Sequence, residues 1–114
     1  MSNEYSGQDL YLAQRAQEER LHTALRALSS RGKGYAEAER KYRIALNQKI
    51  LKERDKGTPV TIINDLCRGD YAIAQLRFNR DVAEIQYKAA LEAINVYKLT
   101  IRVLSEQIDR EFRG

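Results

Sequence analysis

The chain has 114 residues, of which 43% are hydrophobic and 32% charged, with one Pro, one Cys and no Trp. This length predicts a single domain, and the balance of residues is typical of solvated helices rather than of a β-sandwich or a disordered tail. No run of about 18 apolar residues is present, so we expect no membrane-spanning segment. The lone Cys and an N-terminus without the features of a signal peptide predict a cytoplasmic protein.

The net charge of +4 is concentrated in one part of the chain. Residues 31–56 carry nine basic groups against four acidic ones, whereas residues 1–30 and 57–114 are close to balanced. An excess of this kind indicates an anionic partner. A solvated helix face would give the same pattern.

The first predicted helix covers residues 8–31 and follows a flexible N-terminus over residues 1–7. Ser6 and Asp9 have the spacing of a capping box, which places the start of the helix just after Ser6. Leu21, Ala24 and Leu28 share one apolar face. The two glycines of "SSRGKG" then predict that this helix ends or kinks.

A second helix is predicted over residues 35–56 and ends at Gly57. Its apolar arc contains Tyr35, Tyr42, Leu46 and Ile50, which leaves no aromatic residue evidently exposed for base stacking. Its basic residues are a candidate nucleic-acid-binding stripe, because several cations on one face attract phosphates. The stripe consists of Lys41, Lys49, Lys52, Lys56, Arg40 and Arg43.

The segment "KGTPVTIINDLCRGD" predicts a short elbow helix over residues 59–67. Thr58 is a good N-cap, and Pro59 suits the first helical position, where its missing N–H costs nothing. Gly69 suits the exit, and Asp70 is expected to cap the next helix through its side chain. The elbow is therefore interpreted as a corner between helices, and the Arg68-Gly69-Asp70 tripeptide as part of that corner.

The third predicted helix, residues 70–112, contains no Gly or Pro. Heptad spacing predicts one seam along it. The seam consists of Ile73, Leu76, Arg80, Ala83, Tyr87, Ala90, Ile94, Tyr97, Ile101, Leu104 and Ile108. A second apolar face is formed by Phe78, Val82, Ile85, Ala89, Val96, Leu99 and Val103. Two such faces predict neighbours on both sides of the helix.

The lengths of these helices favour an all-α, long antiparallel hairpin or coiled coil with a short elbow helix. In that layout the first two helices run nearly end to end along the third; in the alternative, the first folds back into a compact bundle. Either leaves apolar surface open, so we expect a homo-oligomer, with a dimer completing a helical bundle. The predicted oligomer interface is formed by Ile94, Tyr97, Leu99, Ile101, Leu104 and Ile108.

The sequence shows no catalytic constellation, so we predict that the protein is not an enzyme. His22 has no acidic or thiol partner at metal-ligand spacing, and Cys67 lies near the end of the elbow helix, where the dipole disfavours a thiolate. We therefore expect no catalytic residue, metal or cofactor. Arg80 interrupts the seam; it either pairs with Glu53 or Asp55 across the hairpin or extends out to solvent.

The Gly57-x-Pro59-Val60-Thr61 elbow, the Arg68-Gly69-Asp70 exit and the run "RDVAEIQYKAALEAIN" (residues 80–95) resemble small, uncharacterised helical proteins encoded by phages and prophages of Gram-positive bacteria. Such proteins lie in early gene regions near recombination and single-strand-binding functions. The resemblance covers the C-terminal half of the chain. It implies a phage source and the cytoplasm of the host cell, and it supplies no site residues.

Two functions are compatible with these observations. The first is a non-enzymatic phage-type accessory protein that binds nucleic acid or a protein of the replication–recombination machinery. The alternative is an anti-defence protein that occludes or sequesters a host immune component or its small anionic ligand. The expected partners are therefore a second copy of the chain, together with DNA or a phage or host protein.

Overall fold

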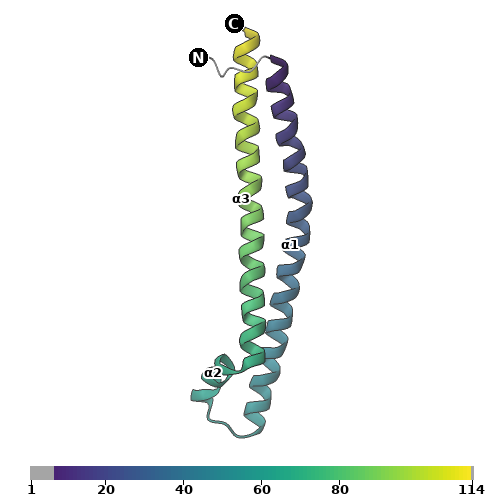
Figure 1. Cartoon of the computed structure of the whole chain (residues 1–114). Helices are drawn as coiled ribbons and strands as arrows, with labels where there is room; N and C mark the ends of the chain where they lie inside the picture. The colour runs from purple at the N-terminus through teal and green to yellow at the C-terminus, as the bar shows by residue number, and fades with distance from the viewer. Residues whose placement is uncertain (1–6, 114) are drawn as a thin grey trace. The chain divides into compact units, whose positions relative to one another are not determined.

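A computed structural model of the protein describes residues 7–113, which form three helices and no strand (Figure 1). The helices are α1 (Gly7–Asp55), α2 (Val60–Gly69) and α3 (Tyr71–Arg113). Residues 7–29 and 88–113 belong to one compact unit, the terminal unit, and Ser30–Tyr87 form a second, the central unit. The prediction of an all-α protein is confirmed for the described residues.

The predicted break at "SSRGKG" is wrong, because α1 is helical without interruption from Gly7 to Asp55. A glycine inside a helix costs only about 1 kcal/mol relative to alanine, which packing against another helix can offset. Gly32 also has a packing role: a Cβ atom there would lie 3.2 Å from Cε1 of Tyr87. The alternative layout requires a turn at these glycines, and α1 has no turn there.

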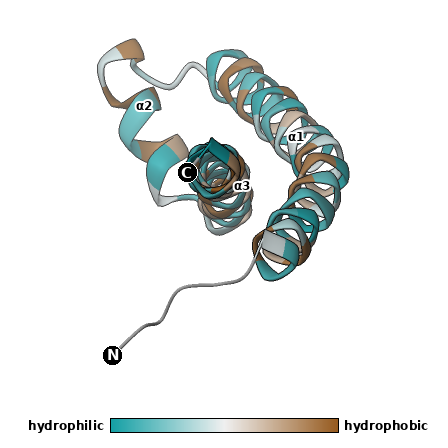
Figure 2. Ribbon diagram, turned by 90° about the horizontal axis from the view of Figure 1, so that it is seen from above, coloured by the Kyte–Doolittle hydropathy of each residue, from teal (hydrophilic) through white to brown (hydrophobic). Residues whose placement is uncertain are grey.

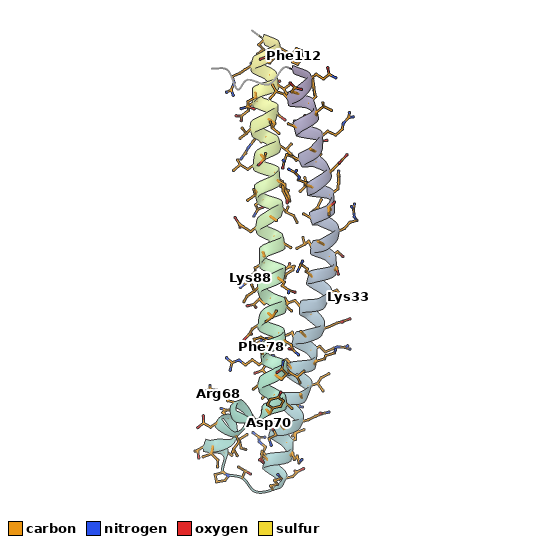
Figure 3. All side chains as sticks on the ribbon, viewed as in Figure 1. Lys33, Arg68, Asp70, Phe78, Lys88 and Phe112 are labelled. Carbon is orange, nitrogen blue, oxygen red and sulfur yellow. The ribbon has the colours of Figure 1, made fainter. Side chains whose placement is uncertain are left out.

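In the terminal unit, α1 and α3 pack antiparallel. Cβ of a residue at position 7 would lie 2.9 Å from the ring of Phe112, and the Gln14 amide donates a hydrogen bond of 2.5 Å to Ser105. The residue numbers of both pairs add up to 119, as an antiparallel register requires. Figure 3 shows Phe112 near the end of α3. The most buried residues of this unit are Leu10, Ile94 and Ile108.

In the central unit, the pairs between α1 and α3 also have residue numbers that add up to 119. The Tyr35 hydroxyl donates a hydrogen bond of 2.6 Å to Glu84, and Arg80 lies 3.4 Å from Glu39. The helix α2 packs beside them through Ile63 and Cys67, which are buried one turn apart. Figure 2 shows both hydrophobic and hydrophilic stretches along α2.

The heptad seam predicted on α3 is confirmed. Ile73, Ile94 and Ile108 are buried, and every other member of the seam is half-buried. Five of the six residues of the expected oligomer interface also belong to this seam. They are Ile94, Tyr97, Ile101, Leu104 and Ile108. Of the six, only Leu99 is exposed.

The corner between α1 and α3 follows the prediction in part. The carboxylate of Asp70 accepts a hydrogen bond of 3.0 Å from the Ile73 amide, which confirms it as the cap of α3. Pro59 rather than Thr58 is the N-cap of α2, and the Thr58 hydroxyl instead lies 3.5 Å from Glu53. Gly57 has φ of 81°, a backbone conformation that favours glycine and ends α1 with a sharp turn.

The expected flexible N-terminus, residues 1–7, falls only partly within the described residues. Gly7 is helical in the structure, while the rest of the expected flexible N-terminus, including the Ser6 cap, lies outside the described residues. Within residues 7–113, none of the helices has the length and apolar character needed to cross a membrane.

Candidate functional site: an arginine-lined groove

The central unit contains a groove of about 570 Å³ between α1, α2 and α3. This volume lies within the range of about 300–1,000 Å³ that is common for ligand sites. Four arginines, two aromatic residues and one carboxylate are among its lining residues: Arg43, Arg68, Arg77, Arg80, Tyr42, Phe78 and Asp81. Figure 3 labels Arg68 on α2 and Phe78 on α3. The charged lining is therefore strongly basic.

Helical spacing explains how each element contributes to the groove. Residues three or four positions apart lie on one face of a helix. The lining follows this spacing in all three helices: Tyr42, Arg43 and Leu46 of α1, Asn64, Cys67 and Arg68 of α2, and Ala74, Arg77, Phe78 and Asp81 of α3. Burial of Ile63 and Cys67 fixes which side of α2 faces the other helices, and this places Arg68 at the groove.

Arg80 is the central residue of an ion-pair network. Its guanidinium donates hydrogen bonds of 2.9 and 3.1 Å to Asp81, contacts Glu39 at 3.4 Å and lies 4.6 Å from the centre of the Tyr42 ring. The predicted partners Glu53 and Asp55 are wrong. The antiparallel register places Arg80 opposite Glu39 and places those two carboxylates nearer the elbow.

The network also lowers the pKa of the Glu39 carboxylate. The hydrogen bond from Arg43, at 2.6 Å, is the main cause that lowers the pKa of Glu39, and the charge of Arg80 lowers it further. Nearby, the hydrogen bond to Glu84 is the main cause that raises the pKa of Tyr35. Two of the four arginines, Arg43 and Arg80, are thus already paired within the chain.

The other two arginines are open to a ligand. Neither Arg68 nor Arg77 has an ion pair with any acidic residue among residues 7–113. Both are exposed, and Phe78, the neighbour of Arg77, has 60% of its surface exposed. The groove therefore presents two unpaired guanidinium groups beside an exposed aromatic ring. Guanidinium groups bind phosphates in a bidentate manner, and an aromatic ring can stack on a base.

The residues of the basic stripe predicted on residues 35–56 differ in their exposure and in their ion pairs. Lys49 is half-buried, 3.7 Å from Asp70 and 3.9 Å from Glu53, and Lys56 also lies 3.9 Å from Glu53. Glu53 itself is buried. Arg43 pairs with Glu39 and lines the groove. Lys49 is the one half-buried member of the stripe, and the other five, Arg40, Lys41, Arg43, Lys52 and Lys56, are exposed.

The two residues considered for catalysis lie apart in the chain and in different units. His22 is an exposed residue of the terminal unit, and Cys67 is a buried, free thiol of the central unit. No group of three or more His, Cys, Asp or Glu residues between positions 7 and 113 is placed to hold a metal ion.

Sequence reasoning did not assign Arg68, Arg77 or Phe78 to a site. The available signal was the spacing of residues 64, 67 and 68 and of residues 74, 77, 78 and 81, each of which marks one helix face. That signal becomes informative only when the orientation of α2 is known, because α2 supplies one wall.

Comparison with known proteins adds no further assignment. No protein-family model matches the chain, and no curated protein or solved structure matches it at a significant level.

Proposed function

We propose that this protein is a non-enzymatic accessory protein of phage type that binds nucleic acid through the arginine-lined groove. The observation that carries the proposal is the pair of unpaired arginines, Arg68 and Arg77, on the walls of one groove. The chemistry of the groove favours nucleic acid over a protein of the replication–recombination machinery. Two guanidinium groups are better suited to bind successive phosphates of a nucleic-acid strand than to bind an apolar surface of a protein.

Each residue of the groove has a separate task in this proposal. Arg68 and Arg77 contact phosphates, and the exposed ring of Phe78 stacks on a base. Arg80 is held by Asp81 and Glu39, so it contributes positive potential and keeps the neighbouring side chains in place. Tyr42 is covered by the Arg80 guanidinium at 4.6 Å and is therefore a support rather than a stacking surface.

The experiment is a fluorescence anisotropy titration of labelled single-stranded and double-stranded DNA at about 50 mM salt. We expect Arg77→Gln and Arg68→Gln each to weaken binding about tenfold, because each removes one charge-assisted contact. Lys33→Gln is the matched control, since it removes the same charge from an exposed position outside the groove. Phe78→Ala is expected to weaken binding to single strands more than to duplex.

A third comparison separates the groove from the basic stripe. Lys52→Gln removes an exposed stripe residue that does not line the groove. If Lys52→Gln and Lys33→Gln weaken binding as much as Arg77→Gln does, the protein binds through its general charge and the groove assignment is wrong. Absence of binding by the wild-type protein would overturn the proposed function itself.

A second candidate, the anti-defence protein, is supported by the outer surface of α2. Ile62 and Leu66, one turn apart, are 44% and 42% exposed and could meet an apolar surface of a host protein. This function predicts that expression in a bacterium with an active defence system raises phage plaque counts. Ile62→Glu should abolish that effect and Arg77→Gln should not. The reverse pattern would contradict it.

A further inference from the structure

The terminal unit leaves one face of α3 without a neighbour. Val96, Leu99 and Val103 are 51%, 52% and 43% exposed. With Ala89, Ala93 and Thr100 they form a stripe without charge, which we call the outer α3 face. At 100° per residue the centre of Val96, Leu99 and Val103 lies about 170° from the seam of Ile94 and Ile108 that packs against α1. The terminal unit therefore leaves the centre of this face, Val96, Leu99 and Val103, exposed.

Charged residues border the outer α3 face in an ordered way. Glu92 and Glu106 interrupt the stripe at two points, and Lys88, Arg102 and Asp109 run along one edge of it. The stretch of face between the two glutamates carries no charge, which is unusual for an exposed helix surface in a chain with 32% charged residues. A face with an apolar centre and charges of both signs at its border is suited to a partner whose charges complement it.

We infer that the outer α3 face binds the same face of a second copy of the chain in an antiparallel arrangement. The two-fold axis lies between Val96 and Leu99, so that Val96 of each copy packs on Leu99 of the other. Val103 then packs beside the aliphatic part of Glu92 of the second copy. Ala93 and Thr100 face each other along the uncharged edge, where their small side chains allow close approach.

Charge complementarity selects this arrangement. With a rise of about 1.5 Å per residue, Arg102 lies about 1.5 Å along the axis from Glu92 of the second copy. Lys88 has the same offset from Glu106 of the second copy and lies about 3 Å from Asp109 of the second copy. Among these five residues, the nearest like charges along the axis, Glu92 and Glu106 of the second copy, are about 4.5 Å apart. Opposite charges are thus closer than like charges.

A parallel arrangement is disfavoured by the same residues. In a parallel dimer each position faces its own copy, so Glu92 meets Glu92 and Glu106 meets Glu106 at the interface. Such like-charge pairs oppose association. An exposed ion pair contributes only about 0.2–1 kcal/mol, so the charges set the orientation while the apolar centre supplies most of the affinity.

The size of the face bounds the affinity. Residues 89–103 span about 21 Å of helix, and a single helix face of this length covers less than the roughly 800 Å² per partner of a stable interface. The dimer is therefore expected to be weak, with a dissociation constant of about 10–100 µM.

The test is sedimentation equilibrium of the full chain over a concentration range that brackets this constant. Leu99→Asp should weaken association at least tenfold, because it places a carboxylate at the centre of the interface. Leu12→Asp is the matched control: Leu12 is an exposed apolar residue of α1 in the same unit, at 56% exposure. It should leave association unchanged. Circular dichroism checks that each variant keeps its helical content.

Charge reversal then tests the antiparallel pairing directly. Glu92→Arg and Arg102→Glu should each weaken association about threefold or more. The double variant should restore association, because each acidic side chain again faces a basic one of the other copy, with the two signs exchanged. Within one chain the two positions are about 15 Å apart along the helix, so they cannot compensate each other there. A monomeric wild-type protein, unaffected association of Leu99→Asp, or a double variant as weak as the single variants would each overturn the inference.

Discussion

Replacing Gly34 by alanine is expected to stabilise the protein, whereas the same replacement at Gly32 is not. Both glycines lie inside the continuous helix α1, where glycine is less favourable than alanine. Their surroundings differ. A Cβ at position 34 would meet nothing within 4 Å, while a Cβ at position 32 would lie 3.2 and 3.5 Å from two ring carbons of Tyr87.

The size of the effect follows from these surroundings. Gly34→Ala should gain about 1 kcal/mol, the helix-propensity difference between the two residues, because no atom has to move. Gly32→Ala gains the same propensity term but must displace the Tyr87 ring, which also contacts Tyr35 at a centroid distance of 6.0 Å. Overpacking of this kind costs about 1–3 kcal/mol, so the net result for Gly32→Ala is neutral or destabilising.

Urea unfolding, followed by the circular dichroism signal of the helices, measures the free energy of unfolding of both variants. In thermal unfolding the same gain of about 1 kcal/mol should raise Tm by about 4 °C for a chain of this size. Gly34→Ala serves as the internal control for propensity, since both variants add one methyl group to the same helix. If Gly32→Ala stabilises the protein as much as Gly34→Ala does, the close packing of Gly32 on Tyr87 is wrong.

Three further predictions concern stability. Ile94→Ala should lower the free energy of unfolding by about 2–5 kcal/mol, and Leu99→Ala by less than about 1 kcal/mol, because Ile94 is 4% and Leu99 52% exposed; equal losses in urea would contradict the seam. The hydrogen bond from the Ile73 amide is the main cause that lowers the pKa of Asp70. The stabilisation from the ionised Asp70 is therefore complete above the ordinary carboxyl pKa of about 4 and is lost as the pH falls through the lowered value. Asp70→Asn, which keeps the cap, should flatten the acid unfolding curve. The raised pKa of Tyr35, caused mainly by the hydrogen bond to Glu84, stabilises the folded state below the ordinary tyrosine pKa of about 10, and this stability is lost as the pH rises through the folded-state value. The loss of unfolding free energy at alkaline pH, measured in urea, should therefore be smaller in Tyr35→Phe.

The parts of the fold that follow from local periodicity were predictable from the sequence. The heptad spacing of Ile73, Ile94 and Ile108 identified the buried side of α3, because a helix without Gly or Pro keeps one face constant over many turns. The cap at Asp70 was predictable for a similar reason, since the hydrogen bond to the Ile73 amide depends only on residues three positions apart.

The features that depend on tertiary packing were not predictable. The glycines of "SSRGKG" have a low helix propensity, but the cost is about 1 kcal/mol per residue, and packing of α1 against α3 offsets it. The partner of Arg80 depends on the register between two helices, so the sequence pointed to Glu53 or Asp55 near the elbow, whereas the structure pairs Arg80 with Glu39. The groove depends in addition on the orientation of α2, so Arg68 and Arg77 were not recognised as one site.

The salt dependence of DNA binding tests the central proposal most directly. For the wild-type protein and the double variant Arg68→Gln/Arg77→Gln, the logarithm of the binding constant is measured against the logarithm of salt concentration from about 50 to about 200 mM. If both arginines contact phosphates, the slope of the double variant is shallower by about 2, and Lys33→Gln keeps the wild-type slope. Equal slopes for the wild-type protein and the double variant would show that the groove does not bind nucleic acid.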